Sequence, residues 1–300
     1  MSSPLRFALG VVAVVVVLTG VLFVLFMSNP VSIGVYMARS ALERAGYETA
    51  TVDGPRGAQT YFHAGAGPKT VVLLHGMGHQ AGAWIKTTTD LADRHAVIVP
   101  DLAGHGDSEP FDGALTLDDS VAGLAAILDA AVPDGPVVLV GNSMGGWVAL
   151  RYALDRPDRV EQVVLVNSSG LRGDLQDVEL LPKTREEARA LVRAITPPTA
   201  PEPAGFVLDD LVDSIHEGPS PRQVAGVRDS DYVDERLGAL SQRVDIVWGM
   251  EDRLLPAGYG WRFVDLLPNA TFHELPGCGH IPQQQCPQPF NRLLYELLAR

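Results

Sequence analysis

Apolar and polar positions alternate regularly from Glu48 onward, where short apolar runs separate amphipathic stretches. The runs are rich in β-branched residues and nearly continuous, which is typical of strands buried on both faces of a parallel sheet. Stretches with helical periodicity lie between them, as the helices that cover such a sheet require. The runs are residues 70–74, 96–99, 137–140, 163–166 and 244–248. This pattern predicts an α/β domain with a mostly parallel central sheet and helices on both faces.

The two ends of the predicted sheet have signals of their own. Residues 49–52 and 60–63 are separated by Asp53-Gly54-Pro55, whose residue types form turns and so favour an antiparallel pair at the leading edge. Residues 270–275 are the expected last strand, and residues 287–298 are the expected closing helix.

Residues 171–240 interrupt the alternation, because they contain helical periodicity and no convincing strand. Thr184-Arg-Glu-Glu187 has the form of a capping box, which marks the start of a helix. Apolar residues then follow at helical spacing, at Ala188, Leu191, Val192 and Ile195, and again at Leu208, Leu211, Val212 and Ile215. We expect a helical lid inserted over the carboxyl edge of the sheet; the alternative is a helical subdomain without a gating role.

An uncharged apolar segment precedes the α/β pattern. Residues 7–27 are almost wholly Val, Leu, Ala and Phe, and as a helix they would extend about 31 Å at ~1.5 Å per residue, enough to cross a hydrocarbon core of ~30 Å. We therefore expect an uncleaved, single-pass transmembrane helix within an N-terminal anchor and juxtamembrane segment, residues 1–42. A cleaved signal peptide and a buried core helix are the alternatives. Arg6 and Arg39 lie on opposite sides of the span, so the side of the membrane that holds residues 43–300 stays open.

The chain has a formal net charge of −13. The only charged residues of segment 1–42 are Arg6 and Arg39, so the remainder is more acidic still. An acidic surface repels phosphate backbones, which excludes nucleic acid as a partner and disfavours polybasic membrane docking. The two cysteines, Cys278 and Cys286, cannot form a disulfide framework; we expect unpaired thiols, and at most one bridge.

The candidate chemistry begins at Gly141-Asn142-Ser143-Met144-Gly145, which lies directly between a buried run and a helical stretch. A serine on so tight a strand-to-helix turn is strained, and the positions two before and two after it must lack side chains for the turn to close. The turn lifts the hydroxyl above the sheet, at the N-terminus of a helix, where developing negative charge is stabilised. The pattern predicts Ser143 as a nucleophile.

A serine nucleophile needs a base and a carboxylate. Glu251 and Asp252 follow the buried run 244–248, and His280 follows the last predicted strand, after Gly277-Cys278-Gly279. We expect His280 as the base and Asp252, in preference to Glu251, as the carboxylate that orients it. A nucleophilic triad of Ser143, Asp252 and His280 is the resulting hypothesis.

Two backbone amides are expected to bind the developing oxyanion. One is that of Met144, the residue after the nucleophile, and the other is that of Met77, between Gly76 and Gly78 in the loop after residues 70–74. His75 and His79 are four residues apart, but the intervening glycines make a metal-binding helix improbable, and we expect no metal. Residues 101–108 are expected to form a structural turn near the site.

These motifs and their order resemble the α/β-hydrolase superfamily over roughly residues 48–300. The N-terminal segment, Asn167-Ser-Ser-Gly-Leu171 and the entry to the helical stretch at 181–187 are similar to its membrane-anchored monoacylglycerol lipase branch. The resemblance implies a serine hydrolase that cleaves lipid-like carboxylic esters through an acyl-enzyme, without a cofactor. A serine at position 143, in place of an aspartate, disfavours the epoxide hydrolase and haloalkane dehalogenase branches.

Two alternatives remain open from the sequence. The Gly141–Gly146 segment is also similar to carbon–carbon bond hydrolases that cleave vinylogous diketones. A non-enzymatic alternative is an anchored pseudohydrolase that binds a partner, which the intact set of Ser143, Asp252 and His280 disfavours. The oligomeric state, the acyl length and the positional preference are not specified by the sequence.

Overall fold

The central feature of the computed structural model, which describes residues 19, 24, 26–173 and 178–300, is an eight-stranded sheet. The strand order is β1-β2-β4-β3-β5-β6-β7-β8. The strands are β1 (Glu48–Gly54), β2 (Gly57–Ala64), β3 (Thr70–Leu74), β4 (Ala96–Pro100), β5 (Val137–Asn142), β6 (Val160–Val166), β7 (Arg243–Gly249) and β8 (Ala270–Leu275). The β1–β2 and β2–β4 pairs are antiparallel, and all other pairs are parallel. The predicted sheet, with its antiparallel leading edge, is confirmed.

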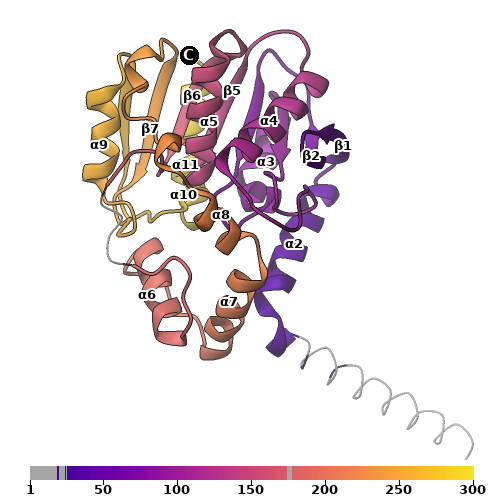
Figure 1. Cartoon of the computed structure of the whole chain (residues 1–300), viewed down its shortest axis with the longest axis vertical. Coiled ribbons are helices and arrows are strands. Elements are labelled where there is room, and N and C mark those ends of the chain that lie inside the picture. The colour runs from indigo at the N-terminus through magenta and orange to yellow at the C-terminus, as the bar shows by residue number, and fades with distance from the viewer. Residues whose placement is uncertain (1–18, 20–23, 25, 174–177) are drawn as a thin grey trace, which may run out of the picture.

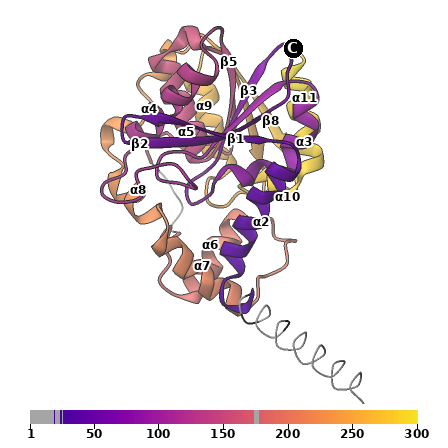
Figure 2. The same cartoon turned by 90° about the vertical axis from the view of Figure 1, so that its right-hand side faces the viewer.

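Helices cover both faces of the sheet (Figures 1 and 2). They are α2 (Pro30–Arg44), α3 (Ile85–Ala92), α4 (Leu117–Ala131), α5 (Met144–Asp155), α6 (Arg185–Ile195), α7 (Gly205–Glu217), α8 (Ser220–Gly226), α9 (Ala257–Leu266), α10 (Pro282–Gln285) and α11 (Pro287–Leu298). Because side chains alternate along a strand, Val72 and Leu74 of β3 pack in the core beneath α4, α5 and α9, whereas Val71 and Leu73 pack in the core beneath α3 and α11. This burial on both faces explains the continuous apolar runs.

The stretch that interrupts the strand pattern is helical, as predicted. It contains α6, α7 and α8, and no strand forms within the described residues 171–173 and 178–240. At the start of α6, the Thr184 hydroxyl accepts a hydrogen bond from the Glu187 amide, but the Glu187 carboxylate accepts from the Lys183 amide, so the box is shifted by one residue. Helices α6 and α7 lie below the sheet in both views, and α7 contacts both α6 and α2 (Figures 1 and 2).

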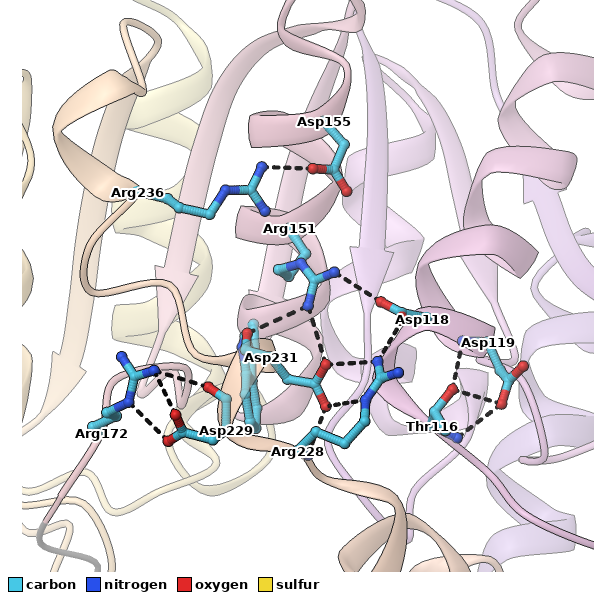
Figure 3. Close-up of polar contacts among 11 residues, drawn as sticks. Thr116, Asp118, Asp119, Arg151, Asp155, Arg172, Arg228, Asp229, Asp231 and Arg236 are labelled. Atoms are coloured by element: carbon cyan, nitrogen blue, oxygen red, sulfur yellow. Dashed lines mark hydrogen bonds and ion pairs between the residues drawn. The ribbon is translucent and has the colours of Figure 1, made fainter.

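A cluster of ion pairs fixes the end of this helical stretch to the core helices (Figure 3). The Asp231 side chain is 1% exposed and accepts hydrogen bonds from Arg228, two residues after α8, and from Arg151 on α5. Both arginines also pair with Asp118 on α4. The Trp147 indole of α5 donates to the Asp231 carbonyl at 2.8 Å. We call Asp231, Arg228, Arg151 and Asp118 the acidic clamp.

The beginning of the helical stretch is tied to the same region. Arg172 donates from its guanidinium to Asp229 at 3.0 Å (Figure 3). Its backbone amide donates to Asp234 at 2.9 Å. The Tyr259 hydroxyl of α9 exchanges hydrogen bonds with the Leu171 amide and carbonyl, each at 2.8 Å. Both ends of the stretch therefore meet at the surface of α5 and α9.

The prediction of a single-pass membrane anchor is corrected. The expected span, residues 7–27, lies almost entirely outside the described residues, and within the described part no helix is long and apolar enough to cross a bilayer. Helix α2 has 15 residues and carries charges. Its Arg39 pairs with the buried Asp101 and with Asp107, each at 2.5 Å, which holds α2 against the α/β domain. The described part of the chain therefore does not support the expected transmembrane helix or membrane location.

The expectation of unpaired thiols is also wrong, because Cys278 and Cys286 form a disulfide. Their Cα atoms are 5.9 Å apart. Cys278 lies in the loop after β8 and Cys286 lies between α10 and α11, so the bridge closes the segment that contains His280.

The acidic clamp provides a test of how the helical stretch is stabilised. Asp231→Ala leaves the partly buried Arg151 without its buried partner, so we expect the free energy of unfolding to fall by about 2 kcal/mol after allowance for the exposure of Arg228. Asp229→Ala is the matched control, because its carboxylate pairs with Arg172 but is 84% exposed, and we expect its free energy of unfolding to stay close to that of the wild type. Urea denaturation measures both. Equal losses in the two variants would contradict a stabilising role for the clamp.

Candidate active site

Ser143 lies on the tight turn between β5 and α5. Its backbone has φ 54° and ψ −120°, a conformation that non-glycine residues rarely adopt. A Cβ atom on Gly141 would lie 2.3 Å from the Gly145 carbonyl oxygen, and one on Gly145 would lie 2.3 Å from the Leu74 carbonyl oxygen. Side chains at these two positions would push α5 away from the sheet. The spacing of the motif therefore has the steric cause expected from the sequence.

His280 and Asp252 form a buried pair. The His280 Nδ1 atom lies 2.7 Å from Asp252 Oδ2, with both side chains nearly inaccessible to solvent. The other carboxylate oxygen of Asp252 accepts hydrogen bonds from the Leu254 and Leu255 amides, each at 2.9 Å. The structure thus brings Asp252, and not the Glu251 side chain, to the imidazole.

Asn167 fixes the Asp252 carboxylate from the neighbouring strand. It follows β6 with φ 42°, donates to Asp252 Oδ2 at 2.8 Å and accepts from the Gly249 amide at 2.8 Å. In the sequence, Asn167 belongs only to the segment that carries the family resemblance, without a predicted role. A usable signal was its residue type, because asparagine tolerates a left-handed backbone better than other side chains do.

The loop that carries His280 is held by three further polar contacts. Asn142, the residue before the nucleophile, donates to the His280 carbonyl at 2.9 Å and accepts from the Gln283 amide group at 3.1 Å. The carbonyl of Ile195, the last residue of α6, accepts from the His280 amide at 2.9 Å. Sequence reasoning missed Asn142, Gln283 and Ile195, because their partners are distant in the chain.

The end of α6 also supports the loop that carries Asp252. The carbonyl of Ala194 accepts a hydrogen bond from the Arg253 amide, directly after Asp252, at 2.9 Å. The Gln285 side chain donates to the Ile195 carbonyl at 2.8 Å. Two carbonyls at one helix terminus therefore hold the backbones beside both His280 and Asp252.

Two buried histidines hold the loop 76–78, which contains Met77. The His75 Nδ1 atom donates to the Gly76 carbonyl at 2.8 Å, and its Nε2 atom accepts from the Leu102 amide at 3.0 Å. The His105 Nε2 atom accepts from the Gly78 amide at 3.3 Å, and its Nδ1 atom faces the Ala103 carbonyl at 3.0 Å. Each imidazole uses one nitrogen as a donor and the other as an acceptor, so the bonding requires both rings to be neutral.

Burial keeps these two histidines neutral. Desolvation is the largest cause that lowers the pKa of His75 to about 3, against the opposing effect of its bond to the Gly76 carbonyl. Desolvation, followed by the proximity of His75, lowers the pKa of His105 to about 3. The two ring centroids are 5.1 Å apart, so protonation of either ring would disfavour protonation of the other. Sequence analysis assigned residues 101–108 to a structural turn near the site and assigned His75 no function.

A cavity of about 380 Å³ opens next to Ser143 and His280. Met77 and Met144, the two residues whose amides were expected to bind an oxyanion, also line it. Its apolar residues come from α5, α6, α7, α8 and nearby loops, and include Trp147, Leu180, Leu191, Val192, Ile195, Leu211, Ile215, Val224, Val227, Leu254, Leu255 and Ile281. No Asp, Glu, Lys or Arg lines the cavity in the described part of the chain. In the same residues no three His, Cys, Asp or Glu side chains gather as a metal site would.

The fold and this arrangement of residues agree with the comparisons with known proteins. The chain belongs to the alpha/beta hydrolase family, which it matches over residues 71–293, and is thus a hydrolase. It is 32% identical over 271 residues to the dihydrolipoyllysine-residue acetyltransferase component of the acetoin cleaving system of Cupriavidus necator, with 85% of this chain and 70% of that protein covered.

Two further comparisons cover most of the chain. It is 30% identical over 265 residues to a 2-hydroxy-6-oxononadienedioate/2-hydroxy-6-oxononatrienedioate hydrolase of Paraburkholderia xenovorans, with 80% of this chain and 90% of that protein covered. The crystal structure of a membrane phospholipase A, a bacterial virulence factor, superposes with a TM-score of 0.78 at 23% identity over 98% of each chain. The second likeness shows the shared fold.

The neutral histidine pair predicts a pH dependence of stability. Between pH 6.5 and about 3 the unfolded chain binds protons at these histidines and the folded chain does not, so the pair stabilises the fold fully above pH 6.5 and progressively less as the pH falls. His105→Gln removes one of these groups. We expect the advantage of the wild type over this variant in free energy of unfolding to shrink by up to about 1.4 kcal/mol per pH unit below pH 6.5.

Urea denaturation between pH 4 and 7.5 measures this difference. His63→Gln, which removes a half-buried histidine from β2 and leaves His75 and His105 in place, is the control. If the free energies of unfolding of the wild type and His105→Gln change in parallel with pH, His105 does not contribute in this way.

Proposed function

We propose that this hydrolase cleaves uncharged carboxylic esters that have an apolar chain, with Ser143, His280 and Asp252 as its triad. The observation that supports this proposal most is the cavity itself. Ser143 and His280 line a largely apolar space without a charged side chain among the described lining residues. Such a space suits a hydrocarbon chain whose ester group reaches the serine hydroxyl.

The proposed reaction follows from the bonding of His280. Because Nδ1 of His280 faces the Asp252 carboxylate, its Nε2 atom is free to accept the proton of the Ser143 hydroxyl. The serine oxygen attacks the ester carbonyl, and the amides of Met77 and Met144 donate to the oxyanion. His280 returns its proton to the departing alcohol. A water molecule, deprotonated by His280, then attacks the acyl-enzyme; the bond between the acyl carbon and the Ser143 oxygen breaks, His280 returns the proton to that oxygen, and the acid leaves.

In this proposal the helices α6, α7 and α8 act as a lid over the reacting atoms. All three contribute apolar residues to the cavity wall, such as Leu191, Leu211 and Val224. Removal of water from the site strengthens every electrostatic interaction in it, including those with the oxyanion.

Carbon–carbon bond cleavage is the second candidate. Curated relatives that are 28–30% identical to this chain are named as hydrolases of 2-hydroxy-6-oxo acids. Those names describe substrates with one or two carboxylates. A buried carboxylate without a cationic partner is strongly disfavoured, and the described cavity lining offers no lysine or arginine. This absence favours the ester over the diketone acid.

The first test of the proposal is Ser143→Ala, which removes the nucleophile without adding volume. We expect turnover of esters to fall by about 10³-fold or more, because a triad acts as a unit. Initial rates are measured on p-nitrophenyl esters of increasing chain length, on monoacylglycerols and on a vinylogous diketone acid. Retained ester hydrolysis in the variant would exclude the proposed nucleophile, and preference for the diketone would favour the second candidate.

A second test compares the two adjacent acids. Asp252→Asn removes the charge that faces His280 and should lower turnover by roughly 10³- to 10⁴-fold. Glu251→Gln is the matched control, because the Glu251 side chain does not contact the imidazole among the hydrogen bonds of the described residues, and it should keep most of the activity. The opposite order of the two variants would identify Glu251 as the acting carboxylate.

A further inference from the structure

Gln223 is an amide without a partner in the wall of the cavity. It lies on α8 and is 2% exposed. Within the described residues neither its Oε1 nor its Nε2 atom has a hydrogen-bond partner, although the residue lines the same cavity as Ser143. A buried polar group left unpaired costs about 1–3 kcal/mol, so native proteins rarely retain one without a reason. A polar group of a ligand in the cavity would supply the missing partner.

Ser220 places a second polar group beside this amide. It lies three residues before Gln223 on α8 and therefore on the same side of the helix, and it also lines the cavity. A Cβ atom on Gly78 would lie 3.0 Å from the Ser220 hydroxyl, and one on Gly76 would lie 3.2 Å from the Cβ atom of Ser143. The loop 76–78 thus separates Ser143 from Ser220. The polar side of α8 faces the cavity next to the proposed oxyanion site.

Helix α8 is fixed in place, so its polar groups are preorganised. Immediately after it, Arg228 joins the acidic clamp on α4 and α5 (Figure 3). Within α8, the Arg222 guanidinium donates to the Pro110 carbonyl at 3.0 Å. Gly226 packs so closely on the segment before α4 that a Cβ atom there would lie 1.9 Å from the Leu115 carbonyl oxygen. A group held this way loses little entropy when it binds a substrate.

We propose that Gln223, with Ser220 beside it, is a subsite for a hydroxyl group on the alcohol part of the ester. This inference rests on the proposed ester hydrolysis. A hydroxyl both donates and accepts, as the side-chain amide does, and it is uncharged, as the cavity lining requires. The hydrocarbon chain of the acid suits the apolar residues of α6 and α7, such as Leu191 and Leu211. The alcohol part of the ester would then lie against the polar side of α8. The enzyme should therefore prefer partial esters of polyols to simple alkyl esters.

The test uses two esters that differ only in hydroxyl groups, glyceryl monooctanoate and propyl octanoate. Gln223→Met keeps the length of the side chain and removes both polar atoms. We expect the wild type to prefer the glyceryl ester, and the variant to lose about 10-fold in kcat/KM on that ester while its value for the propyl ester stays within about 2-fold. Ser220→Ala, a smaller change, should shift the same ratio in the same direction.

The matched control is Gln242→Met, the same substitution at a residue that does not line the cavity and whose amide donates to the Pro157 carbonyl. It should leave the ratio unchanged. The melting temperature separates a subsite from a structural role. Because Gln223→Met removes an unpaired buried amide, its melting temperature should equal or exceed that of the wild type. If Gln223 had a structural role instead, Gln223→Met would lower the melting temperature and would reduce kcat/KM for both esters by the same factor.

The outcomes separate this inference from the proposed function. If the wild type hydrolyses both esters without preference, or if Gln223→Met lowers both values by the same factor, the subsite is excluded and ester hydrolysis stands. If the wild type cleaves neither ester and does cleave the diketone acid, both proposals fail. Loss of the glyceryl preference with an undiminished melting temperature supports the subsite.

Discussion

The close contact of three backbones, those of β5, β3 and the first turn of α5, is the constraint on which the site depends. Gly141 and Gly145 allow it, since a Cβ atom at either position would lie 2.3 Å from a main-chain oxygen. Because α5 begins so close to the sheet, Ser143 takes a left-handed conformation at its first turn. The loop 76–78 then packs against Ser143, and the cavity wall is built outward from that loop.

The surroundings of Ser143 differ in charge on its two sides. On one side the Asp252 carboxylate is buried but accepts four hydrogen bonds, from His280, Asn167 and two backbone amides, which is what makes a buried charge tolerable. On the other side His75 and His105 stay neutral and use their nitrogens to shape a loop. Next to the imidazole the buried carboxylate has, among the described residues, no ion-pair partner other than His280, whereas behind the loop 76–78 the buried Asp101 carboxylate is paired with Arg39.

The sequence allowed the sheet, the antiparallel edge and the closing helix to be predicted, because local periodicity determines them. It also singled out Ser143, Asp252 and His280, each at the end of an apolar run. Contacts between distant residues were not predictable: Gln283 bonds to Asn142, 141 positions away. The bridge between Cys278 and Cys286 is local, but it depends on how the loop after β8 returns to α11, which the spacing of the two cysteines does not specify. The expectation of a membrane anchor rested on the length and composition of residues 7–27 alone, and these residues lie almost entirely outside the described part of the chain.

The end of α6 ties this helix to the backbones on both sides of the His280–Asp252 pair. Its last two carbonyls accept hydrogen bonds from the backbone amides of His280 and Arg253, while Asn142 and Asn167 hold the same loops from the sheet side. A displacement of α6 would therefore cost two backbone hydrogen bonds next to the pair, so the position of this helix and the rigidity of the pair are coupled.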